Sequence, residues 1–136
     1  MKRRLVNPPG TEGVYRSWHF SQAVRVGDTI WVSGQVGAGP KGAASGISAQ
    51  ARLAFENLRA VLAEAGAGLA DVVELVTYHV DMREMPAFAK VKQEFFPENY
   101  PAWTAVGGTA LALPELRVEV RATAVAGSAT RERPAP

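Results

Sequence analysis

Residues 101–127, PAWTAVGGTALALPELRVEVRATAVAG, contain the pattern that decides the fold of this chain. They predict two strands joined by a turn that contains proline. In the second strand apolar and polar side chains alternate, so they point to opposite faces of a sheet. The apolar set is Leu116, Val118, Val120 and Ala122, and the polar set is Arg117, Glu119, Arg121 and Thr123. Because such a sheet commonly leaves its polar face in water, we expect any chemical site around this pair of strands.

The length and composition predict one soluble domain. The chain has 136 residues, of which 47% are hydrophobic, enough to bury a core. We expect a core over about 15–126 and a flexible tail over 128–136. The basic N-terminus has no apolar segment of a signal peptide, and no apolar run is long enough for a membrane span, so a cytoplasmic location is expected. Without cysteine, the chain has no disulfide, thiol nucleophile or thiolate metal site.

The positive charge does not predict a nucleic-acid surface. The formal net charge is +2, but residues 2–4 contribute +3 and residues 131–133 contribute +1. The body of the chain therefore carries a net charge of −2. Because the basic groups belong to the termini and not to a folded face, we expect neither specific nucleic-acid binding nor a membrane partner.

The remaining chain predicts strands and two helices in the order ββ-α-β-α-ββ. Gly27-Asp28 suits a tight hairpin turn, and the glycine-rich segment 34–46 suits a loop. The expected strands are a short edge strand at 4–6, the hairpin arms 15–26 and 29–33, and a strand at 72–82. One helix is expected from an N-cap at Ser48 to about Ala65, ended by Gly66, and a second over 87–96 after Pro86.

This order predicts an α+β fold with a mixed sheet and both helices on one face, because two helices are too few to cover two faces. The other face would carry mainly Val, Ala, Gly, His and Thr side chains with a few charges. A sheet face so poor in charge is a candidate for burial by self-association, with sites between the copies.

Glu119 is the best acid/base candidate, because partial burial raises a carboxyl pKa while neighbouring cations lower it. Arg117 and Arg121 stand two residues to either side on the same face. From spacing alone, a row of salt bridges between subunits is the favoured interpretation. The alternative is a general acid/base acting on water, with an arginine for a substrate carboxylate.

The two histidines do not predict a metal site. His79 and Asp81 share a strand face, but no third ligand has suitable spacing. His79 is expected to be a hydrogen-bonded strand residue, and His19 suits either a pocket or the surface. The sequence also lacks a P-loop and the G-x-S-x-G, H-E-x-x-H and EF-hand patterns.

Four segments, in order along the chain, resemble the RidA family (reactive intermediate deaminase A, also called YjgF or endoribonuclease L-PSP). They are Phe20-Ser21-Gln22-Ala23-Val24, residues 29–35 (TIWVSGQ), residues 50–66 and residues 101–124 with Val118-Glu119-Val120. The resemblance implies a chorismate-mutase-like sheet backed by two helices, and a homotrimer with clefts between subunits. It also implies hydrolysis of 2-imino or enamine acids to 2-oxo acids and ammonia without a cofactor.

The family's site residues carry over only in part. Glu119 matches the family glutamate, and Ser33 and Gly34 match the segment that lines the cleft. Phe20 stands where the deaminases usually have tyrosine, and Trp103 occupies the position of the carboxylate-binding arginine. An indole has one N–H donor and no charge, so it cannot replace a bidentate guanidinium. The chain therefore resembles the arginine-lacking branch of the family, in which 2-imino acid deamination is doubtful.

We therefore expect a cleft lined by Phe20, Ser33, Gly34, Trp103 and Glu119. Arg121 is the nearest replacement cation and Arg16 a weaker one, while a tryptophan wall would also suit a flat, less acidic or cationic ligand. One hypothesis is cofactor-free hydrolysis or tautomerisation of a small reactive imine or carbonyl compound, with backbone N–H groups near Gly34 and Gly107 holding an oxyanion. Alternatives are a trimer that binds a metabolite without turnover and, less favoured, a ribonuclease or translation inhibitor. Packing of Trp103 in the core at the trimer seam is an equally open interpretation.

Overall fold

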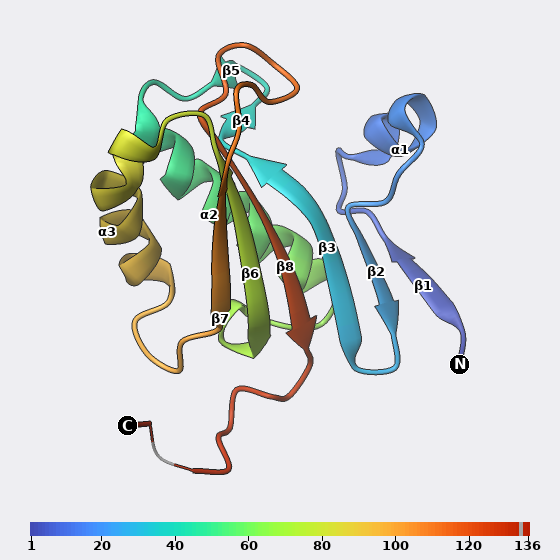
Figure 1. Ribbon diagram of the computed structural model, residues 1–136. Helices are drawn as coiled ribbons and strands as arrows, with labels where there is room; N and C mark the ends of the chain where they lie inside the picture. The colour runs from blue at the N-terminus through green and yellow to red at the C-terminus, as the bar shows by residue number, and fades with distance from the viewer. Residues whose placement is uncertain (134) are drawn as a thin grey trace.

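The computed structural model describes residues 1–133 and 135–136, and its centre is a six-stranded sheet in the order β1-β2-β3-β8-β6-β7 (Figure 1). Only β6 and β7 run parallel; the other neighbours are antiparallel, which confirms the predicted mixed sheet. The strands are β1 (Arg3–Val6), β2 (Ala23–Val26), β3 (Thr29–Val36), β6 (Val72–His79), β7 (Ala102–Gly107) and β8 (Val118–Val125). The short strands β4 (Ala38–Gly39) and β5 (Gly42–Ala43) form a separate hairpin.

Helices α2 (Ile47–Glu64) and α3 (Met85–Phe95) cover one face of the sheet, as predicted (Figure 1). Single turns of 3₁₀ helix precede β6 and α3, at η1 (Leu69–Asp71) and η2 (Met82–Glu84). The rings of Phe55 on α2 and of Phe88 and Phe95 on α3 pack together, with centroids 5.7 Å and 5.3 Å from Phe55. All three are buried, and each contributes about 1.5–3 kcal/mol by leaving water.

Strand β8 has the predicted alternation. Val118, Val120, Ala122 and Ala124 are buried toward the helices, whereas Glu119, Arg121, Thr123 and Val125 point to the other face. However, β7 and β8 are not neighbours, because β6 lies between them. The two strands that the sequence placed side by side are therefore not adjacent: β8 is interior and β7 is an edge strand.

Helix α1 (Glu12–Trp18) replaces the first half of the predicted strand 15–26, so the structure has a third α-helix. It buries none of its residues, and Figure 1 places it beyond the β1–β2 side of the sheet. Sequence periodicity could not find it, because a helix without a core face has no apolar stripe. It ends where His19 adopts a left-handed conformation with φ of 60°.

The predicted ends of α2 are right at one end and wrong at the other. Gly66, with φ of 88°, follows the helix as expected. Gly46 and not Ser48 occupies the N-cap position, and no side chain caps the helix. The segment 34–46 is only partly a loop, because β3 continues to Val36 and the β4–β5 hairpin follows.

The tail begins as an ordered continuation of β8. Ser128 Oγ donates to the carbonyl oxygen of Asp71 at 3.2 Å, and the N–H of Ala129 donates to the Asp71 carboxylate at 3.1 Å. Flexibility of the rest of 128–136 stays a prediction, and position 134 lies outside the described residues. Among the described residues, every helix is too short or too polar to cross a membrane.

Candidate functional site

A β-bulge at Ser33 and Gly34 forms one wall of the candidate site. In the pairing of β3 with β8, Val32 lies opposite Ala122 and Gln35 lies opposite Val120. Strand β3 thus has one extra residue between these pairs, and Arg121 is the residue that faces the bulge. Bulges are frequent next to functional sites because they redirect a side chain and interrupt the hydrogen-bond ladder.

The bulge is fixed by hydrogen bonds to the segment that precedes β2. The N–H of Ser33 donates to the carbonyl oxygen of Gln22 at 2.9 Å, and its Oγ donates to that of Ser21 at 2.7 Å. The buried amide of Gln35 donates to the side-chain oxygen of Gln22 at 2.9 Å. Phe20, next to this anchored segment, has 41% of its surface exposed. The structure therefore holds the bulge rigidly and leaves the Phe20 ring accessible.

Glu119 lies directly against Gly34. A Cβ atom on residue 34 would stand 2.6 Å from Cδ of Glu119, so glycine is required for the carboxylate to lie where it does. The Glu119 side chain is half-buried, and this burial raises its pKa above the ordinary value of 4.5. Ser33, Gly34 and Glu119, which the sequence assigned to one site, are thus brought together.

The two arginines beside Glu119 have other partners. Nε of Arg117 donates to the Glu84 carboxylate at 2.7 Å, and Nε of Arg121 donates to the Tyr78 hydroxyl at 3.1 Å. Within the described residues, no side chain donates a hydrogen bond to Glu119 and no cation pairs with it. A half-buried carboxylate without a bound cation can exchange a proton with a ligand more readily than a salt-bridged one.

Tyr78 is a further candidate site residue, which the sequence did not indicate. It lies directly opposite Glu119 in the pairing of β6 with β8, on the face away from the helices. The alternation within residues 72–79 could have put Tyr78 on this face, but only the strand register places it across from Glu119. Tyr78 thus places a phenolic hydroxyl on the same face of the sheet as Glu119, whereas Phe20, at the position of the family tyrosine, has none.

Trp103 lies on the opposite face of the sheet from Glu119. Its indole N–H donates to Oγ1 of Thr77 at 3.0 Å, and its ring centroid is 6.2 Å from that of Phe88 on α3. Thr77 Oγ1 also lies 2.7 Å from Nε2 of His79. Both residues are buried, which confirms the prediction that His79 is a hydrogen-bonded strand residue. One copy of the chain therefore does not present Trp103 and Glu119 to the same ligand.

Lys92 on α3 covers the indole of Trp103, with Nζ 4.2 Å from the ring centroid. This is a cation–π contact, and burial lowers the pKa of the ammonium. By contrast, Asp81 is engaged by Arg83 at 2.8 Å, and these hydrogen bonds lower the Asp81 pKa to about 2. In the described part of the chain, no three His, Asp or Glu side chains gather as a metal ion would need.

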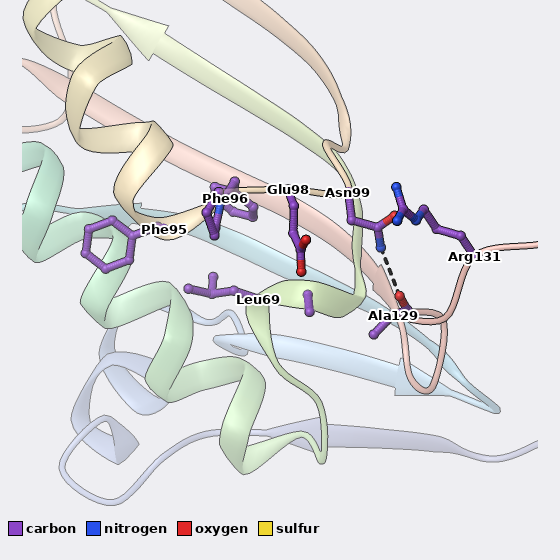
Figure 2. Close-up of a pocket in the computed structure, with 9 residues that line it drawn as sticks. Leu69, Phe95, Phe96, Glu98, Asn99, Ala129 and Arg131 are labelled. Atoms are coloured by element: carbon purple, nitrogen blue, oxygen red, sulfur yellow. Dashed lines mark hydrogen bonds between the residues drawn. The ribbon is translucent and has the colours of Figure 1, made fainter. Parts of the chain in front are cut away.

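A separate hollow of about 250 Å³ lies near the start of β6, away from these residues (Figure 2). Leu69, Phe95 and Phe96 form its apolar part, and Glu98, Asn99 and Arg131 are among its polar residues. Asn99 donates to the carbonyl oxygen of Ala129 at 2.9 Å and so ties the tail to the chain after α3. None of the predicted site residues lines it.

The comparisons with known proteins agree with this fold. The family model described as endoribonuclease L-PSP matches residues 13–126. The chain belongs to this family. The YjgF/RidA resemblance seen in the sequence is therefore confirmed, whereas the arginine-lacking branch is a finer assignment that stays a prediction.

Named relatives and solved structures extend over nearly the whole chain. The RutC family protein YjgH of Escherichia coli is 38% identical over 123 residues, 88% of this chain and 94% of the relative. The human 2-iminobutanoate/2-iminopropanoate deaminase is 32% identical over 135 residues, which cover 94% of this chain and 93% of the relative. A solved structure of YjgH superposes with a TM-score of 0.83 at 37% identity, covering 93% of this chain and 98% of that one. The structure of Rv2704 of Mycobacterium tuberculosis superposes with a TM-score of 0.80 at 34% identity, covering 91% of this chain and 99% of that one.

Proposed function

We propose that this protein is a cofactor-independent enzyme that hydrolyses a small reactive imine or enamine, or tautomerises a related carbonyl compound, with Glu119 as its acid/base. The observation that carries the proposal is the position of Glu119: a half-buried carboxylate, packed on the Ser33–Gly34 bulge, whose pKa is raised by burial. A carboxyl group with a raised pKa both accepts and donates a proton nearer to neutral pH.

Hydrolysis of an imine needs a proton to move in each direction. As water adds to the imine carbon, Glu119 accepts a proton from it and the imine nitrogen takes a proton from solvent, which gives a neutral carbinolamine. Glu119 then returns its proton to nitrogen, and the C–N bond breaks as the hydroxyl releases its proton to solvent and the carbonyl forms. The products are a carbonyl compound and ammonia, so no oxidant or cofactor is consumed. Backbone N–H groups near Gly34 and Gly107 would hold the developing negative charge. The relatives named 2-iminobutanoate/2-iminopropanoate deaminase support this class of reaction.

We propose that the site is a cleft between copies of a homotrimer. Trp103 is on the edge strand β7, on the helix side, whereas Glu119 faces away from the helices. A second copy docked along the β7 edge would bring its Glu119 face to the first copy's Trp103. The outer face also carries exposed apolar side chains, of which Trp31 is 48% and Val106 40% exposed, and these favour burial against another copy.

The indole of Trp103 limits which imines are hydrolysed. It occupies the position where the family resemblance puts an arginine, and it offers neither a charge nor a bidentate pair of donors. We therefore expect the 2-imino acids that name the human relative to be hydrolysed more slowly by this chain than by that enzyme.

The test is ammonia release from imines generated in situ by an amino-acid oxidase. Glu119→Gln abolishes the rate above background if Glu119 moves the proton, whereas Glu115→Gln, an exposed carboxylate on the approach to β8, leaves it unchanged. Trp103→Arg increases the rate on 2-imino acids if the rest of the site is intact. No rate above background with any amino acid would sink the deaminase proposal.

A binding protein without turnover is the second candidate, and one observation favours it. At the position where the family resemblance puts an arginine, the Trp103 side chain already has partners within the chain: its N–H donates to Thr77, and Lys92 covers its ring. Ligand binding without ammonia release or tautomerisation would support this function. A ribonuclease is less favoured, because the body of the chain is weakly acidic and no acid/base pair of histidines exists. Glu119→Gln leaving RNA cleavage unchanged would assign such activity to a contaminant.

A further inference from the structure

Lys92 is a half-buried cation on α3 that has no carboxylate partner among the described residues. Its Nζ lies over Trp103, 4.2 Å from the ring centroid, so it is held at the β7 edge of the sheet and not extended into water. Removing an ammonium from water costs free energy that a nearby anion normally offsets. The Lys92 ammonium is thus partly buried without a carboxylate counter-ion from the described residues.

The indole beneath Lys92 is fixed in orientation. An indole N–H can only donate, so Oγ1 of Thr77 accepts the 3.0 Å hydrogen bond from Trp103. The Thr77 hydroxyl also lies 2.7 Å from Nε2 of His79, and it can donate its proton to that nitrogen when the imidazole is neutral and Nε2 is unprotonated. Burial lowers the pKa of His79 and favours that same neutral form. Thr77 and His79 are therefore positioning residues for the Trp103 platform.

Trp103 is also reachable from outside the chain. It is 37% exposed and lies on β7, which pairs with β6 and with no other strand among the described residues. A small molecule at this edge would meet the ammonium of Lys92 and the rim of the indole together. A cationic ligand is disfavoured there, because Lys92 already covers the indole and like charges repel. Arg121 cannot take the same role within one chain, since it bonds Tyr78 on the other face.

We infer that Lys92 is the cation of the site, and that it binds the carboxylate of a small organic anion against the Trp103 platform. The inference rests on the proposed function, because it names the substrate class of that cleft. An ammonium is a compact charge, whereas a planar guanidinium binds both oxygens of a carboxylate. Lys92 therefore fixes the orientation of a carboxylate less strictly than an arginine would. The ligand is thus an acid recognised through one charged contact and the indole edge.

The experiment measures binding without turnover. Benzoate is titrated into the ¹⁵N-labelled protein while the indole N–H signals are followed, with the Trp103 signal identified by Trp103→Phe. Benzamide serves as the uncharged probe of the same shape, and benzylammonium as the cationic one. We expect benzoate to shift the Trp103 signal and to bind at least about tenfold more tightly than benzamide, as a charge-assisted hydrogen bond implies.

The variants separate the charge of Lys92 from its surroundings. Lys92→Met should weaken benzoate binding about tenfold or more, Lys92→Arg should retain most of it, and Lys90→Met, an exposed lysine on the same helix, should have no effect. Equal binding by Lys92→Met and wild type, or tighter binding of benzamide or benzylammonium, would overturn the inference. So would absent benzoate binding together with weaker self-association of Lys92→Met, because Lys92 would then pair with a carboxylate of a second copy.

The outcomes also distinguish this inference from the proposed function. If benzoate binds through Lys92 in both wild type and Glu119→Gln but no imine is hydrolysed, Lys92 is the binding cation and the catalytic proposal fails. If ammonia release depends on Glu119 while Lys92→Met changes neither benzoate binding nor the KM for the imine, the catalytic proposal stands and this inference fails.

Discussion

Gly34→Ala tests the packing between the bulge and Glu119 directly. The new Cβ would lie 2.6 Å from Cδ and 2.9 Å from Cγ of Glu119. To reach ordinary van der Waals contact at 3.4 Å, the carboxyl carbon must retreat by about 0.8 Å. Overpacking of this kind costs about 1–3 kcal/mol. Gly34 has an ordinary φ, so backbone strain does not contribute.

The assay is urea unfolding followed by circular dichroism, at one fixed protein concentration because association changes apparent stability. Gly39→Ala is the matched control, since its Cβ would meet nothing within 4 Å. In a double-mutant cycle, Glu119→Ala removes the obstructing atoms, so Gly34→Ala should become nearly neutral in that background. The expected coupling free energy is about 1–2 kcal/mol.

The same substitution should lower activity, because a catalytic carboxylate moved by about 1 Å loses on the order of a hundredfold in rate. A Gly34→Ala protein as stable as Gly39→Ala, or an equal cost of Gly34→Ala with and without the Glu119 carboxylate, would refute the packing described here.

Further predictions concern stability. Glu119→Gln should raise the free energy of unfolding at pH 7, because the folded state disfavours the ionised carboxylate of Glu119. This gain in stability should shrink as the pH falls through the raised pKa and should disappear below about pH 4.5, where the carboxyl group is protonated in both states. Urea unfolding at several pH values measures it. Thr77→Val should cost about 1–3 kcal/mol by leaving Trp103 and His79 without their shared partner, and an unchanged Trp103 indole N–H shift in NMR would contradict this. Gly37→Ala should be more damaging than Gly34→Ala in thermal unfolding, since its Cβ would meet the backbone of Gln50, which cannot retreat as a side chain can.

The sequence predicted the parts of the fold that have a buried periodic face. Strand β8 alternates because its even-numbered residues are buried on the side of the sheet where α2 packs, and the helices were found through stripes such as Phe88, Val91 and Phe95. Helix α1 was missed because it buries nothing. The neighbours of β7 were missed because local patterns contain no information about strand order: β6 is inserted between β7 and β8 although it precedes both in the chain.

The candidate site divides in the same way. Glu119 and Gly34 were assigned to one cleft, because the two positions carry over together from the family resemblance, and in the structure they lie against each other. Lys92 was not, since it becomes significant only where α3 packs beside the edge of β7, and no motif joins it to Trp103. Alternation assigns a side chain to a face of its own strand, whereas only the three-dimensional arrangement tells which helix residue covers it.

The separation of Trp103 and Glu119 onto opposite faces has a genetic consequence if the cleft is shared between copies. Lys92→Met damages the half that one copy contributes, and Glu119→Gln damages the half that its neighbour contributes. Refolded together, two such impaired proteins would form mixed rings in which about a quarter of the clefts contain both intact halves. Two defective alleles expressed in one cell would then complement each other, whereas two variants damaged in the same half would not.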